Sequence, residues 1–62
     1  MNQEAVVEFE GKTFRAYRMP HSPIQYAVDY VQNGRTHGLV ISHAAVPPSV
    51  RHELLKKLGV IA

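Results

Sequence analysis

The chain has 62 residues, no cysteine and a formal net charge of +2, and 45% of its residues are hydrophobic. A chain of this length forms one domain and buries only about 60% of the surface that its unfolded form exposes, so its stability must come from a well-packed core, a partner subunit or both. Without cysteine it can form no disulfide bond and offer no thiolate to a metal ion, which fits a reducing compartment.

The sequence carries no recognisable membrane or secretion signal. Unbroken apolar runs such as Gly38–Ile41 are far too short to cross a bilayer. The first four residues, Met1-Asn2-Gln3-Glu4, lack the basic and then apolar pattern of a secretion signal. We therefore expect a cytoplasmic protein that does not associate with a membrane.

The segment from about residue 5 to residue 18 is predicted to be a β-hairpin. Glycine at position 11 suits the first central position of a type II′ turn, where φ is positive, so we expect a Gly11–Lys12 turn. This register puts Phe9 opposite Phe14 and Glu8 opposite Arg15. Its apolar face holds Val7, Phe9, Phe14 and Ala16. We expect this hydrophobic pattern to exclude the neighbouring register, which has a Glu10–Gly11 turn.

Residues from about 24 to 43 carry a stronger hairpin signal, because Asn33-Gly34 separates two apolar runs and both residues tolerate the positive φ of a type I′ turn. The implied opposite pairs are Gln32 with Arg35, Val31 with Thr36, Tyr30 with His37, Asp29 with Gly38, Val28 with Leu39, Ala27 with Val40 and Tyr26 with Ile41. One face, which we expect in the core, holds Ile24, Tyr26, Val28, Tyr30, Leu39 and Ile41. The reverse face is more apolar than a solvated strand needs, and we expect the tail helix, the other hairpin or a second molecule to cover it.

Residues 19–23 join the two hairpins, and their two prolines favour an extended connector. A helix is predicted from about residue 48 to residue 58, with Pro48 at its first position, Ser49 as a competing N-cap and Gly59 as the left-handed residue after its end. Its apolar stripe is Val50, Leu54, Leu55 and Leu58. The predicted fold class is therefore α+β: two antiparallel hairpins that form a four-stranded sheet or a small SH3-like barrel, followed by one C-terminal helix.

Few residues could support catalysis or metal binding. His37 and His43 share a face, but six strand residues separate them by about 20 Å, which is too far for one ion. Asp29 lies mid-strand, where we expect it to point to solvent or to accept a hydrogen bond from Thr36 or Arg35. The sequence has no metal-binding or phosphate-binding motif, and no histidine beside a nucleophile with a supporting acid. We expect no enzymatic activity, no metal and no cofactor.

Nucleic-acid binding is the leading functional prediction. All seven basic residues lie within residues 11–62, where Asp29 and Glu53 are the only acidic ones. This imbalance indicates an anionic partner, with ordinary solvated charge as the alternative. Basic residues interleaved with an aromatic residue on a sheet can hold phosphates and stack against bases. The predicted binding residues are Lys12, Arg15, Tyr17, Arg18 and Arg35.

Three short pieces of the sequence occur in a recognisable order. They are Val7-Glu8-Phe9 before a glycine turn, Gly34-Arg35-Thr36 in the second hairpin and Glu53-Leu54-Leu55 in a proline-started helix. This layout resembles that of small archaeal chromatin proteins, which implies an SH3-like barrel with a C-terminal helix and binding to the minor groove of DNA. The chain has three lysines, no tryptophan and a shorter join between its hairpins than that family, so the resemblance is one of layout and assigns no binding residue.

A protein-binding role is the alternative prediction. A small domain without cysteine that has surplus apolar surface often completes its core with a partner. The predicted partner interface is Ala27, Val31, Val40, Leu54 and Leu55. In this alternative the chain acts as a regulator or inhibitor of another protein and forms a homodimer.

Overall fold

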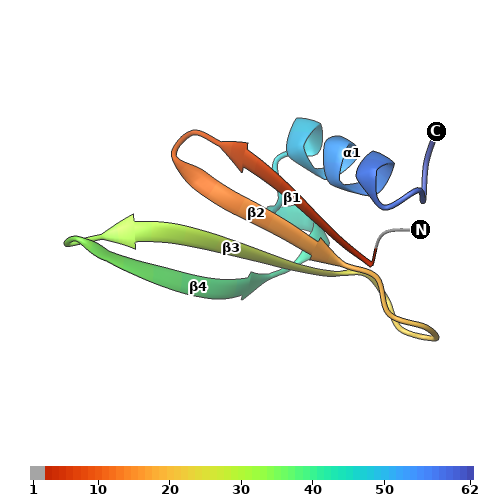
Figure 1. The fold of residues 1–62 in the computed structure, drawn as a ribbon, viewed down its shortest axis with the longest axis horizontal. Coiled ribbons are helices and arrows are strands. Elements are labelled where there is room, and N and C mark those ends of the chain that lie inside the picture. The colour runs from red at the N-terminus through yellow and green to blue at the C-terminus, as the bar shows by residue number, and fades with distance from the viewer. Residues whose placement is uncertain (1–2) are drawn as a thin grey trace.

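The computed structural model describes residues 3–62 and shows four antiparallel strands followed by one helix (Figure 1). The elements are β1 (Glu4–Phe9), β2 (Lys12–Tyr17), β3 (Gln25–Gln32), β4 (Arg35–Ile41), the short 3₁₀ helix η1 (His43–Ala45) and α1 (Pro48–Lys57). The strands lie in the order β1-β2-β3-β4, so β1 and β4 are the two edges of an open sheet. The predicted α+β class is confirmed, and the sheet does not close into the SH3-like barrel that the resemblance implied.

The second hairpin has the register that the sequence predicted. Asn33 and Gly34 have φ values of 53° and 75°, which are the positive angles that a type I′ turn requires at both central positions. The pairing runs from Gln32 opposite Arg35 to Tyr26 opposite Ile41, as expected. The turn residues alone were therefore sufficient to fix which side chains lie opposite one another in β3 and β4.

The predicted register of the first hairpin is wrong by one turn position. The turn is Glu10–Gly11, with φ values of 50° and 76°, and Phe9 lies opposite Lys12. The expected pairs of Phe9 with Phe14 and of Glu8 with Arg15 are therefore absent. Moving a two-residue turn by one position shifts the opposing strand by two residues, so every side chain stays on its face. The hydrophobic pattern could identify the apolar face, but it could not choose between these two registers.

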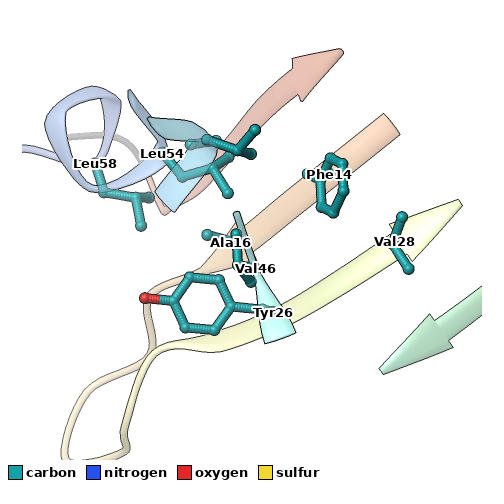
Figure 2. Close-up of a cluster of buried hydrophobic side chains, with 9 residues drawn as sticks. Phe14, Ala16, Tyr26, Val28, Val46, Leu54 and Leu58 are labelled. Carbon is teal, nitrogen blue, oxygen red and sulfur yellow. The ribbon is translucent and has the colours of Figure 1, made fainter. Parts of the chain in front are cut away.

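The buried side chains lie between one face of the sheet and the helix (Figure 2). They are Ala5, Phe14, Ala16, Tyr26, Val28, Val46, Val50, Leu54 and Leu58. We call the face that carries Phe14 and Tyr26 the inner face and the opposite one the outer face. The helix packs on the inner face over β1 and β2 (Figure 1). The expectation that the helix or the first hairpin covers the outer face is wrong, since both hairpins lie in one sheet and α1 packs on the other side.

The ends of α1 follow the predicted chemistry in most respects. Pro48 is the first helical residue, and Pro47 rather than Ser49 occupies the N-cap, without a side-chain hydrogen bond. At the C-terminus Gly59 has a φ of 79°. Its N–H donates to the Lys56 carbonyl, and the next N–H, of Val60, donates to the Leu55 carbonyl, each at 3.0 Å. These two bonds form a Schellman motif, which stops the helix.

Removal of the Leu54 side chain should destabilise the fold strongly. Leu54 is 0% exposed, so we expect Leu54→Ala to lower the free energy of unfolding by about 2–5 kcal/mol. Leu55, the neighbouring leucine of the same helix, is only partly buried. In urea titrations Leu55→Ala should therefore cost clearly less, and equal losses for the two variants would contradict the observed orientation of the helix.

The register of the first hairpin can be tested at its turn. Because Glu10 has a φ of 50°, a conformation that asparagine tolerates better than glutamate, we expect Glu10→Asn to stabilise the protein by up to about 1 kcal/mol. Glu8→Asn is the matched control, since Glu8 lies within β1. Thermal unfolding should show a gain for the first variant only, and a gain of the same size in both would argue against the Glu10–Gly11 turn.

Candidate interaction surface

The end of the second hairpin lies outside the core. Every residue from 31 to 40 is exposed, and we call this segment the arm. It includes three large apolar side chains, Val31, Leu39 and Val40, which are 66%, 54% and 64% exposed. The arm extends away from α1, at the end of the sheet opposite the chain termini (Figure 1). Val31 and Val40 lie on one face of the sheet and Leu39 on the other, so the arm exposes apolar groups on both faces, where a partner could contact them.

The arm makes the molecule more extended than a compact domain. The radius of gyration is 11.7 Å, compared with about 10.6 Å for a compact domain of this length. The exposed surface is 4429 Å², which is about 400 Å² more than a compact monomer of this size exposes. The cause is the length of the helix, because ten residues of helix reach about 15 Å, whereas the eight residues of β3 reach about 26 Å.

An apolar groove lies on the part of the inner face that α1 leaves open. Its volume is about 350 Å³, within the range of about 300–1,000 Å³ that ligand sites show. The side chains that line it are Phe14, Val28, Tyr30, Leu39 and Ile41 on the sheet, Ala45 and Pro47 before the helix, and Lys12 at the rim. From the sequence we expected Tyr30 and Leu39 in the core. Alternation along a strand predicts on which face a side chain lies but not whether another element covers that face, so the groove was not predicted.

The two faces of the sheet carry opposite charge. On the inner face the strand residues include the cations Lys12 and Arg35 and no carboxylate. On the outer face three carboxylates, those of Glu4, Glu8 and Asp29, accompany one cation, Arg15. The groove therefore lies on the face that favours an anionic partner.

The structure divides the residues predicted to bind nucleic acid. Lys12 and Arg35 are on the inner face, whereas Arg15 and Tyr17 are together on the outer face. Arg18 follows β2, and its Nη1 donates to the Leu58 carbonyl at the end of α1, at 3.4 Å. The five side chains therefore do not form one continuous patch.

Arg15 is held between two carboxylates on the outer face. Its Nε lies 3.0 Å from Asp29 Oδ2, and its Nη1 lies 3.3 Å from Glu4 Oε2. The hydrogen bond to Asp29, and then that to Glu4, raise the pKa of the Arg15 guanidinium above its usual value. We expected Asp29 to point to solvent or to accept a hydrogen bond from Thr36 or Arg35, but it pairs with Arg15 instead. These contacts join β1, β2 and β3 and leave Arg15 with little free charge for a phosphate.

Gly38 leaves room for this arrangement. A Cβ atom at position 38 would lie 3.1 Å from Asp29 Oδ1, which is closer than ordinary van der Waals contact. The side chain of Asp29 therefore lies across the backbone of Gly38 on the neighbouring strand, where no other residue type fits without displacing the carboxylate.

Two of the four histidines, His43 and His37, each contact a different tyrosine. The Tyr26 hydroxyl and His43 Nδ1 are hydrogen-bonded at 3.0 Å, and burial raises the pKa of Tyr26. His37 stacks on Tyr30, with ring centroids 5.4 Å apart and an interplanar angle of 26°. Within residues 3–62 no three side chains of His, Asp or Glu come together in a way that could hold a metal ion.

The residues predicted to bind a protein partner are also divided. Ala27, Val31 and Val40 lie on the outer face, and the two valines are well exposed. Leu54 is fully buried in the chain's own core, and Leu55 is partly buried. Of this predicted set, the two valines of the arm are therefore the large side chains that a partner could reach.

Comparison with protein-family models, curated proteins and solved structures finds no match for this chain. In the part of the chain that the structure describes, no helix has the length and apolar character needed to cross a membrane. Its function is therefore inferred from the chemistry of its own surface.

The contact between Gly38 and Asp29 can be measured with a double-mutant cycle. Gly38→Ala should be more favourable in an Asp29→Ala background than in the wild type, by at least about 0.5 kcal/mol, because the carboxylate no longer crowds the new methyl group. Chemical unfolding of the four proteins gives this coupling energy. Additive effects would show that the Asp29 carboxylate does not lie over Gly38 in solution.

Proposed function

We propose that this chain is a small, non-enzymatic protein-binding module that regulates or inhibits another protein by holding one of its side chains in the inner groove. The observation that carries the proposal is the open groove itself, which is floored by the apolar side chains of Val28, Leu39 and Ile41. A partner that covers these groups removes apolar surface from water, which is the main driving force for association.

The charge of the inner face indicates what kind of segment fits. Lys12 lies at the rim of the groove and Arg35 lies further along the arm, on a face whose strands carry no carboxylate. An apolar side chain flanked by Asp or Glu complements this combination, because the apolar group fills the groove while the carboxylate pairs with a cation at the rim. We therefore propose an acidic, apolar segment of a protein as the ligand.

Nucleic-acid binding through Lys12, Arg15, Tyr17, Arg18 and Arg35 stays a prediction, and it draws less support from the geometry. Arg15 is paired with two carboxylates, and the cations occupy both faces of the sheet. Electrostatic binding of nucleic acid gains from each phosphate that is neutralised, so it is favoured by several cations on one surface. The apolar floor of the groove suits an aliphatic or aromatic side chain better than a phosphate backbone.

The proposal is tested by capture of proteins from a native lysate, with and without nuclease. Ala45 is exposed and forms part of the groove wall, so Ala45→Trp should fill the groove without disturbing the core. Ala44 is its exposed neighbour and does not line the groove, which makes Ala44→Trp a matched control. We expect the wild type and Ala44→Trp to capture the same protein after nuclease treatment, and Ala45→Trp to lose it.

Two results would count against the proposal. Capture that Ala45→Trp leaves unchanged would exclude the groove as the binding site. Capture that disappears with nuclease, together with a gel shift that weakens steeply as salt rises, would instead support the nucleic-acid prediction.

A further inference from the structure

The two edge strands of the sheet, β1 and β4, differ in whether another element packs against them. At the β1 edge, α1 packs against the strand, and Lys57 Nζ donates a hydrogen bond to the Val6 carbonyl at 2.9 Å. On the side of β4 that faces away from β3, no further strand among residues 3–62 pairs with it. Proteins usually protect an edge strand with lysine, proline, a bulge or a covering element, and the seven residues of β4 contain neither lysine nor proline.

The backbone groups that β4 presents to this edge follow from its turn. In an antiparallel pair, opposite residues alternate between those that exchange two hydrogen bonds and those that exchange none. The pair that flanks the two-residue turn, Gln32 and Arg35, is of the bonded kind. Counting along the strand, Thr36, Gly38 and Val40 are of the other kind, so their N–H and C=O groups point away from β3.

We propose that a second copy of this chain pairs with this edge, with the two β4 strands antiparallel about a two-fold axis at Gly38. The paired sheets form one continuous eight-stranded sheet. This inference goes beyond the proposed function, because it uses the backbone of β4 rather than the groove. Pairing of strand edges is a recurrent mode of association between proteins.

The side chains of β4 favour a second copy as the partner. The strand has one charged residue, Arg35, at its first position. The two-fold axis places the two copies of Arg35 at opposite ends of the new ladder, about 20 Å apart, which is well beyond the screening length of about 8 Å at physiological salt. The Asp29 carboxylate that lies across Gly38, at the centre of this ladder, is paired with Arg15 of its own copy, so it brings little uncompensated charge to the axis.

The same axis places the two arms side by side. Thr36 comes to lie opposite Val40 of the other copy, and His37 opposite Leu39. On the outer face, Val31 of one copy then lies in the same cross-strand row as Val40 of the other, with Thr36 between them. Val31, Leu39 and Val40 are 66%, 54% and 64% exposed, so pairing of the two arms brings large apolar side chains of both copies into one region of the surface, which favours association.

Sedimentation equilibrium of three proteins tests this proposal. Val40→Pro removes an N–H that points to the edge and leaves the ladder with β3 intact, so it should block the dimer. Val40→Thr keeps that N–H and is the matched control. We expect the wild type and Val40→Thr to sediment with about twice the mass of Val40→Pro at micromolar concentration, and far-UV circular dichroism should show the same strand content for all three.

A cross-linking experiment gives a second readout should Val40→Pro fail to fold. The chain has no cysteine, so single-cysteine variants can cross-link only between copies. A mixture of His37→Cys and Leu39→Cys proteins should form a disulfide, because these positions lie opposite one another at about 4.5–5.5 Å between Cα atoms. A Val60→Cys protein, with its cysteine on the exposed C-terminal segment, should not.

Two outcomes would overturn the proposal. One is a wild-type protein that sediments as a monomer at every concentration, and the other is a dimer that folded Val40→Pro leaves intact. Because Ala45→Trp alters the groove and not the edge, this variant should remain dimeric, so loss of the dimer and loss of partner capture are separate results.

Discussion

The structure depends on the docking of one short helix on half of one sheet face. Leu54 of α1 and Leu58, the residue that caps its C-terminus, are fully buried. They belong to one core cluster with the small residues Ala5 and Ala16, and Figure 2 shows both leucines on the side of the sheet that carries Ala16. Burial of each leucine contributes about 1.5–3 kcal/mol. A domain of this length is stable by only about 3–9 kcal/mol in total. A ten-residue helix is not stable alone in water, so helix and sheet each depend on this contact.

The same contact explains why the arm exists. The ten residues of α1 lie over β1 and β2. The helix is too short to extend over the turn end of β3 and β4 as well, so that end stays uncovered. Ordering each residue of the arm costs about 1–2 kcal/mol of backbone entropy. Within the monomer this cost is offset by the ladder with β3, by the Asn33–Gly34 turn and by the stack of Tyr30 on His37. A partner that buries Leu39 or Val40 would add the hydrophobic term that the arm lacks.

Local chemistry made part of this structure predictable from the sequence. Asn33 and Gly34 determine a turn type, and that turn fixes every pair in β3 and β4. At the first turn both Glu10 and Gly11 have positive φ, which glutamate rarely adopts, so residue preference did not indicate this turn. The hydrophobic pattern did not indicate it either, because both registers put the same side chains on the same face. The contact of Arg15 with Glu4 depends on that register. With Val6 opposite Arg15, Glu4 is the diagonal neighbour of Arg15, whereas in the expected register Glu8 would lie opposite Arg15 and Glu4 would be further away.

The candidate interaction surface was harder to predict, because the face on which a side chain lies does not determine whether another element covers it. Strand alternation places Lys12 and Arg15 on opposite faces, which divides the predicted basic patch whatever the rest of the fold does. Cover depends on where a helix docks and how far it reaches, and that is why Leu39 lies in an open groove rather than in the core. In the proposed dimer the two-fold axis stands perpendicular to the sheet, so both inner grooves face the same side. A partner with two acidic, apolar segments could then bind both grooves at once, and the second contact would form at the high effective concentration that tethering provides.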